Sequence, residues 1–185
     1  VNLLQTYGLI AVGVLRSKSK SSNSLWVKVG GEGYQTRIVD NLLEIKANST
    51  MLGYLNAPNP FTEDGWYKTG DSVEVDGEYI KILGRESEMI NVGGEKVYPA
   101  EIESVIQELD NISDVTAYSE KNPITGQIVC VRIRLNHDEN HKDLKKRVKA
   151  YCRDKMPSYK VPVKIEFMTE KLHNERFKKI RSWEK

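Results

Sequence analysis

The apolar pattern of this 185-residue chain changes at Gly84, and this change constrains the fold more than any other feature. Before Gly84, short runs rich in β-branched residues are interrupted by glycine and Asp-Asn pairs, a pattern typical of strands joined by tight turns. In "SVEVDGEYIKIL", Asp76-Gly77 separates two alternating runs and predicts a two-residue hairpin turn. No helical period of similar quality occurs in this part. We therefore expect a small β-barrel or sandwich over residues 1–84.

After Gly84, helical and strand patterns alternate, which predicts an α+β unit over residues 85–185. "MINVGGEKVY" predicts a hairpin that turns at Gly93-Gly94. Pro99 opens a helical stretch with an apolar stripe, and a second helix is expected over about 141–156. Alternating apolar residues predict three strands: 112–118, 127–135 and 161–168. Two helices on one face of this three-stranded sheet would bury a common core.

The composition limits the classes of function. Apolar residues make up 39% and charged residues 29%, as in a soluble globular protein rather than a disordered one. No apolar run approaches the roughly 20 residues that a membrane helix needs. The formal net charge of +2 gives no support for a general nucleic-acid binder, although residues 141–160 hold eight Lys or Arg against two Asp.

The cysteines and histidines predict neither disulfide nor metal. Cys130 lies in a strand-like stretch and Cys152 on a helical apolar stripe, so we expect buried free thiols in a reducing, cytoplasmic protein. The three histidines do not share a spacing that would hold zinc: His137, His141 and His173. The chain begins without an initiator Met or the basic region of a signal peptide, which fits a fragment or a processed chain.

"GWYKTGD", residues 65–71, ends in an acid just before the predicted hairpin. Asp71 at such a rim could accept two hydrogen bonds from the diol of a sugar, as acids do in other nucleotide-binding folds. It could equally cap a turn. The residues alone leave both interpretations open.

"LGRESEMINVGGEKVYPAEIE", residues 83–103, holds two further candidates. The Arg85 guanidinium could bind a phosphate or ribose hydroxyl in bidentate fashion, or pair with a neighbouring glutamate. Gly93-Gly94 could let a ligand approach the backbone, or simply form a tight hairpin. Near the end, "ERFKKIR" is either a solvated basic tail or a site of lysine chemistry.

The order of these stretches resembles the acyl-adenylate-forming (AMP-binding) superfamily, which includes acyl-CoA synthetases and adenylation domains. The stretches that carry the resemblance are "QTYGLIAVG", "GWYKTGD", "GRESEMINVGGEKVYPAEIE" and "KKIR". It covers essentially the whole chain, but only about the last third of a family member. It implies that residues 1–84 are the C-terminal β subdomain of a large N-terminal domain and that residues 85–185 are a mobile lid.

In the N-terminal part, the resemblance assigns three residues to the nucleotide. Tyr7 matches the aromatic residue that stacks on adenine. Asp71 matches the residue that binds the ribose hydroxyls, and Arg85 matches an arginine that contacts the ribose and helps to close the lid.

In the lid, the resemblance assigns the remaining roles. Ser87 falls at the hinge. Gly93 and Gly94 match the loop that lines the pantetheine tunnel, and Lys96 would meet the phosphates of CoA. Lys179 matches the lysine that contacts the carboxylate and the α-phosphate during adenylation.

The sequence departs from the family pattern at two places. After Tyr7-Gly8-Leu9 the family has Thr and then Glu, whereas this chain has Ile10 and Ala11. The glutamate normally holds Mg²⁺, and an alanine side chain offers no oxygen for it. At the C-terminal end the usual Gly-Lys is Lys178-Lys179, and we assign the role to Lys179 because Ile180 follows it.

These observations predict the C-terminal part of an AMP-forming acid–thiol ligase involved in fatty-acid metabolism. It would use ATP, release AMP and act on a small carboxylic acid, with CoA or the phosphopantetheine of an acyl-carrier protein as acceptor. It would need an N-terminal domain and be inactive alone. The alternative is a non-catalytic binding or interaction module with the same fold. A nucleic-acid binder built on the basic 141–160 segment is a third hypothesis, which the absence of aromatic platforms disfavours.

Overall fold

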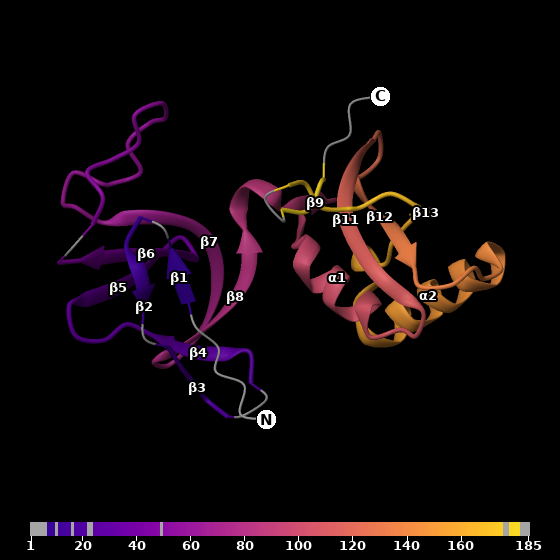
Figure 1. Ribbon diagram of the computed structural model, residues 1–185, viewed down its shortest axis with the longest axis horizontal. Coiled ribbons are helices and arrows are strands. Elements are labelled where there is room, and N and C mark those ends of the chain that lie inside the picture. The colour runs from indigo at the N-terminus through magenta and orange to yellow at the C-terminus, as the bar shows by residue number, and fades with distance from the viewer. Residues whose placement is uncertain are drawn as a thin grey trace. The chain divides into compact units, whose positions relative to one another are not determined.

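The computed structural model divides the chain into two compact units, Val1–Ser87 and Glu88–Lys185 (Figure 1). We call them the N-terminal and the C-terminal unit. The structure describes residues 7–9, 11–15, 17–21, 24–48, 50–175 and 178–181. The pattern change predicted a boundary at Gly84-Arg85, whereas compactness divides the chain after Ser87. The functional domain boundary stays a prediction.

The N-terminal unit is built on a six-stranded antiparallel sheet with the strand order β3-β4-β8-β7-β6-β5. Its strands are β3 (Ser17–Ser19), β4 (Trp26–Val29), β5 (Tyr34–Val39), β6 (Leu42–Ala47), β7 (Tyr67–Asp76) and β8 (Tyr79–Arg85). A separate pair is formed by β1 (Tyr7–Leu9) and β2 (Gly13–Leu15). Leu15, Leu43 and Ile45 are completely buried in the core of this unit.

The β7–β8 turn differs by one residue from the sequence prediction. Asp76 pairs with Tyr79, so the turn residues are Gly77 and Glu78 rather than Asp76 and Gly77. Gly77 has a φ of 60°, and a type II′ hairpin turn requires glycine at its first central position. With Gly77 first, only this glycine needs a positive φ, whereas a type I′ turn at Asp76-Gly77 would also require a positive φ at Asp76.

The C-terminal unit has the predicted α+β composition. Its elements are η1 (Glu86–Glu88, shared with the boundary), β9 (Ile90–Val92), β10 (Glu95–Val97), α1 (Pro99–Gln107), β11 (Ile112–Asn122), β12 (Gly126–Leu135), α2 (His141–Lys155), η2 (Ser158–Lys160) and β13 (Lys164–Phe167). Strand β12 is central, with β11 antiparallel on one side and β13 parallel on the other. The Asn140 side chain caps α2 by accepting two backbone N–H bonds. The predicted class is thus confirmed.

The β9–β10 hairpin turns at Gly93-Gly94, as the sequence predicts, and both glycines have positive φ. It is not separate from the sheet, because Val92 pairs with Gly126 of β12 and gives the order β10-β9-β12-β11. The predicted three-stranded sheet is therefore extended to five strands. The Gly93 N–H donates to the Thr125 carbonyl (2.8 Å), a contact between distant segments that local patterns do not reveal.

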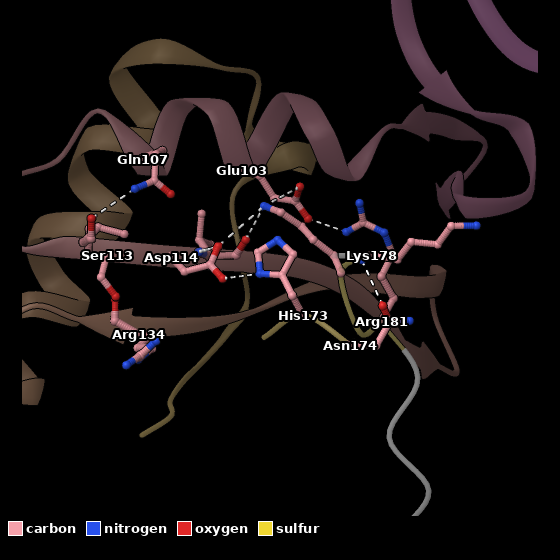
Figure 2. Close-up of polar contacts among 12 residues, drawn as sticks. Glu103, Gln107, Ser113, Asp114, Arg134, His173, Asn174, Lys178 and Arg181 are labelled. Atoms are coloured by element: carbon pink, nitrogen blue, oxygen red, sulfur yellow. Dashed lines mark hydrogen bonds and ion pairs between the residues drawn. The ribbon is translucent and has the colours of Figure 1, made fainter. Parts of the chain in front are cut away.

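Both helices cover the same face of this sheet. Val115 and Ala117 of β11 alternate toward that face, as do Val129, Val131 and Ile133 of β12. They form one buried cluster with the apolar stripes of α1 and α2: Ile102, Ile106, Leu144, Val148 and Cys152. This packing places the last described segment, residues 178–181, beside α1 and β11 (Figure 2).

Both cysteines are free and completely buried, as the sequence predicts. Burial raises the pKa of each thiol to about 11. Among the residues that the structure describes, no helix has the length and apolar character needed to span a membrane.

Candidate functional site

A buried carboxylate, Asp71, lies at the centre of the candidate site in the N-terminal unit. Asp71 is only 5% exposed on β7, and its cross-strand neighbour on β8 is Arg85. Arg85 Nε lies 2.9 Å from Asp71 Oδ1, and the Tyr7 hydroxyl donates a hydrogen bond to Asp71 Oδ2. The structure thus brings together the three residues that the resemblance assigns to the nucleotide. We call them the Asp71 cluster.

Thr69 fixes the backbone around this carboxylate. Its hydroxyl donates to the Leu43 carbonyl (2.7 Å) and accepts the Asp71 N–H (3.0 Å). Arg85 Nη1 donates to the Thr69 carbonyl at 2.5 Å. Sequence reasoning did not single out Thr69, and its only signal was its place within "GWYKTGD".

The Tyr7 phenol acts as a hydrogen-bond donor. Burial, reinforced by the hydrogen bond to Asp71, raises the pKa of Tyr7 well above its ordinary value. The phenol therefore keeps its proton over the physiological range. Its ring packs against the N-terminal core, while the stacking role on adenine stays a prediction.

The Ala11 side chain offers no ligand atom to a metal ion. Ala11 is 3% exposed and packs in the apolar core of its unit. Its carbonyl accepts the Met51 N–H at 3.0 Å. Ile10, the other departure from the family pattern, lies outside the described residues. No group of three or more His, Cys, Asp or Glu able to hold a metal occurs within the described part of the chain.

The second candidate site is an acid–base network in the C-terminal unit, centred on Glu103 of α1 (Figure 2). Glu103 is 6% exposed, and its Oε1 accepts the Ala117 N–H at 2.9 Å and a hydrogen bond from Arg181 Nη1. Lys179 Nζ lies 3.1 Å from Glu103 Oε2. One buried carboxylate therefore faces two cations from the end of the described chain.

The Lys179 ammonium has two further acceptors in the same unit. It donates to the Val115 carbonyl at 2.6 Å and lies 3.9 Å from Asp114 Oδ1. Asp114 also contacts His173, with Nδ1 and Oδ2 2.9 Å apart. In contrast, Lys178 is exposed. The two adjacent lysines are therefore in different environments, and only Lys179 contacts the network.

The residues predicted to bind the acceptor thiol lie on the β9–β10 hairpin. Gly93 and Gly94 form the β9–β10 turn, and open space lies where a side chain on either would point. Lys96 is exposed on β10. A hollow of about 780 Å³ adjoins this hairpin and is lined by Asn91 and the β11–β12 connection. Ser87 ends the N-terminal unit, and its hinge role stays a prediction.

Sequence reasoning did not foresee the carboxylates of the second site. Pro99, Ile102, Glu103 and Ile106 follow the i, i+3, i+4, i+7 spacing of one helix face. Glu103 therefore occupies a core position of the stripe, and a buried acid at such a position needs a cationic or hydrogen-bonding partner. This was the available signal. Asp114, His173 and Arg181 had none, because their partners are distant in the chain.

Comparison with known proteins shows the family of the chain. Residues 101–179 match the family model of the AMP-binding enzyme C-terminal domain. The mitochondrial medium-chain acyl-CoA ligase of Bos taurus is 35% identical over 130 residues, or 68% of this chain and 21% of that enzyme. The chain belongs to the acyl-adenylate-forming (AMP-binding) superfamily. It matches the C-terminal portion of these enzymes and spans about a fifth of the length of this relative.

Solved structures show that the superfamily fold is present. The ATP-bound RpMatB-BxBclM chimera B1 has a TM-score of 0.77 and 24% identity, covering 92% of this chain and 38% of that one. The o-succinylbenzoate CoA synthetase of Bacillus subtilis, in complex with its acyl-adenylate intermediate, has a TM-score of 0.74 and 23% identity. That alignment covers 83% of this chain and 34% of the synthetase. The superfamily fold therefore includes both units.

Proposed function

We propose that this chain is the C-terminal part of an AMP-forming acid–thiol ligase. The whole enzyme would activate a carboxylic acid as acyl-AMP and pass the acyl group to the thiol of CoA or of carrier-protein phosphopantetheine. An N-terminal domain would supply most of the ATP and acyl pockets, so the chain alone would be inactive. The observation that carries this proposal is the buried Asp71 carboxylate, fixed beside Arg85 at a position that matches the ribose-binding acid of the superfamily.

The Asp71 cluster has the chemistry to hold a ribose. An ionised carboxylate offers about four lone-pair sites, and Tyr7 and Arg85 contact one oxygen each. The remaining sites could accept the two hydroxyls of a ribose diol. Arg85 is 48% exposed, so its guanidinium could also contact the nucleotide while it keeps its bond to Asp71.

Lys179 would act in the first half-reaction. A carboxylate oxygen attacks the α-phosphorus of ATP, the bond to the β-phosphate breaks and pyrophosphate leaves. The reactants are both anionic, and a lysine ammonium at the α-phosphate and carboxylate would offset this charge as it develops. The Mg²⁺ expected from the resemblance has no ligand at the buried Ala11 side chain, and we assign it no step.

The β9–β10 hairpin would act in the second half-reaction. The thiol attacks the acyl carbon of the adenylate, loses its proton, and AMP leaves. Gly93 and Gly94 leave room for a pantetheine arm close to the backbone, and Lys96 would contact the CoA phosphates. Because this hairpin and Lys179 would act in different steps, rotation of the lid near Ser87 would present them in turn.

A second candidate is a non-catalytic binding module with the same fold. The buried Ala11, which stands in place of the family's metal-binding acid, favours it. The conjunction of Asp71, Arg85 and Lys179 favours the ligase. We expect a cytoplasmic enzyme of fatty-acid metabolism, although the Bos taurus relative is named as mitochondrial.

The decisive experiment compares Asp71→Asn with Asp76→Asn in the protein that carries this chain. Asp76 is on the same strand but pairs with Lys20 at the surface. We expect Asp71→Asn to raise the KM for ATP by about tenfold to a hundredfold in pyrophosphate exchange, because it weakens two charge-assisted hydrogen bonds. Asp76→Asn should leave it unchanged. Absence of pyrophosphate exchange with every carboxylic acid tried, by a folded wild-type protein, would favour the binding module instead.

A further inference from the structure

The Lys179 ammonium is held inside its own unit by one hydrogen bond and two ion pairs, an arrangement that we call the docked position. It donates to the Val115 carbonyl at 2.6 Å, and its nitrogen lies 3.1 Å from Glu103 Oε2 and 3.9 Å from Asp114 Oδ1. An ammonium has three N–H donors and no acceptor. Lys179 must therefore give up some of these contacts before it can bind a substrate carboxylate or phosphate.

Glu103 is the residue on which this docking depends. Its carboxylate is buried, and a buried charge is costly unless it is paired and hydrogen-bonded. Lys179 and Arg181 alternate along an extended segment, so both side chains point toward it. Between them, the Ile180 N–H donates to the carbonyl of the buried Leu172 (2.9 Å), which anchors the segment.

The docked segment covers the free edge of β11 with side chains rather than with another strand. The Val115 carbonyl accepts from Lys179, the Ala117 carbonyl accepts from Arg181, and the Ala117 N–H donates to Glu103. Side chains satisfy exposed strand edges without forming a ladder. Water can replace the Lys179 bond singly, so this side chain can leave while Arg181 keeps the segment in place.

We propose that Glu103 is a positioning residue that holds Lys179 in this docked position while the acyl group is transferred to the thiol. This inference rests on the proposed function, since it assumes that Lys179 acts in adenylation. A contact made in only one of two conformations shifts their populations by its own free energy. The Glu103–Lys179 pair therefore sets how the enzyme divides its time between the two half-reactions.

The first test measures docking directly, without reference to activity. The full chain is labelled with an amine-reactive acetylating reagent, and the exposed Lys178 serves as the internal reference for Lys179. We expect Lys179 to react about tenfold more slowly than Lys178, as expected for an amine that must first break a charge-assisted hydrogen bond. Glu103→Gln should bring the two rates to within about twofold of each other, because the remaining neutral contact is weaker.

A matched control lies on the same helix. Glu101 pairs with Lys160 at 2.7 Å and does not contact Lys179 in the described network. Glu101→Gln should therefore speed the labelling of Lys160 and leave Lys179 protected. If Glu103→Gln fails to fold, Asp114→Asn keeps Glu103 and should raise the Lys179 rate by about threefold, since it removes the longer contact. Equal rates at the two lysines in wild-type protein would overturn the proposal, as would a Lys179 rate that neither variant changes.

The second test uses the two half-reactions of the protein that carries this chain. Glu103→Gln should lower the rate of acyl transfer to the thiol, relative to the rate of adenylation, by about fivefold. This is a typical size for a coupling between two states. A merely structural role would lower both equally and would overturn the proposal. Lys179→Ala separates the two hypotheses. If Lys179→Ala leaves adenylation intact, the role of Lys179 fails and the docking proposal fails with it, whereas the proposed function fails only if wild-type protein does not adenylate. If Lys179→Ala stops adenylation while Glu103→Gln leaves the ratio unchanged, only the docking proposal fails.

Discussion

The two units of this protein each contain a buried carboxylate that contacts two side-chain donors, but the contacts are built differently. In the N-terminal unit, Asp71 and Arg85 are cross-strand neighbours in one hairpin, and their register holds them together. In the C-terminal unit, Glu103 meets Lys179 and Arg181, which lie 76 and 78 residues further along the chain. The first arrangement belongs to the sheet ladder, whereas the second depends on a terminal segment.

This difference indicates what each carboxylate is suited for. The register of β7 and β8 holds Asp71 beside Arg85, so this pair can present a preformed surface to a ligand. The Glu103 network consists of side-chain contacts from a terminal segment, so one side chain can be released while the others remain. A fixed acid suits binding, and a releasable lysine suits a step that occurs once in each cycle.

The largest expected effect is on kcat, and it distinguishes the Lys179 site from the Asp71 site, where KM should change. Lys179→Ala should lower the kcat of adenylation by about a hundredfold to a thousandfold, because a charge that stabilises the transition state is lost. The KM for ATP should remain nearly constant, in contrast to Asp71→Asn. Thioester formation from a supplied acyl-adenylate should change much less. Pyrophosphate exchange and thioester assays would measure these three quantities.

Lys178→Ala is the matched control for this substitution, because Lys178 is adjacent and exposed. We expect it to leave both half-reactions nearly unchanged. Equal loss of the two half-reactions in Lys179→Ala would contradict the assigned role, and a larger loss in Lys178→Ala would move that role to the neighbouring lysine.

The next effect concerns the separate cores. Leu144 of the C-terminal unit and Leu43 of the N-terminal unit are both completely buried. Leu144→Ala and Leu43→Ala should each lower the free energy of unfolding by about 2–5 kcal/mol, through lost apolar burial and a residual cavity. Hydrogen–deuterium exchange should rise mainly in the unit that carries the substitution. An equal rise in both units would show that they unfold together and would remove the basis for comparing them separately.

The smallest effect is a difference in alkaline stability. Burial raises the pKa of Cys152 to about 11, so the folded state binds this proton more tightly than the unfolded state does. The resulting stability is complete below the ordinary thiol pKa of about 9 and is lost as the pH rises toward 11. In the N-terminal unit, the pKa of Tyr67 is raised to about 12, chiefly by burial. The stability that Tyr67 contributes should begin to be lost near the ordinary tyrosine pKa of about 10.

Urea denaturation at pH 8 and pH 10 would measure this difference. Circular dichroism at 222 nm reports the C-terminal unit, because both described α-helices lie in it. The urea concentration at the midpoint of unfolding should be lower at pH 10 than at pH 8. Cys152→Ala should make this difference smaller. If the midpoint of the Cys152→Ala variant depends on pH as strongly as that of the wild-type protein, this thiol makes no contribution.

Much of the fold follows from local patterns. The Gly93-Gly94 turn, the two helices and the main strands of the C-terminal unit were predicted because their signals lie within a few residues. The β7–β8 turn was misplaced by one residue, since Asp-Gly fits a two-residue turn in more than one frame and only the φ of Gly77 and the strand register decide between them. The union of the β9–β10 hairpin with the sheet depends on a pairing with β12, which local patterns do not specify.

By itself, the sequence determined the α+β class, the resemblance to the acyl-adenylate-forming superfamily and the nomination of Asp71, Arg85 and Lys179. Local periodicity and motif order are sufficient for these. Only the tertiary structure decided that Tyr7 donates to Asp71, that Ala11 is buried, and that Lys179 rather than Lys178 meets Glu103 and Asp114. These contacts join residues far apart in the chain, and their geometry depends on the register and packing of strands and helices, which no short stretch of sequence contains.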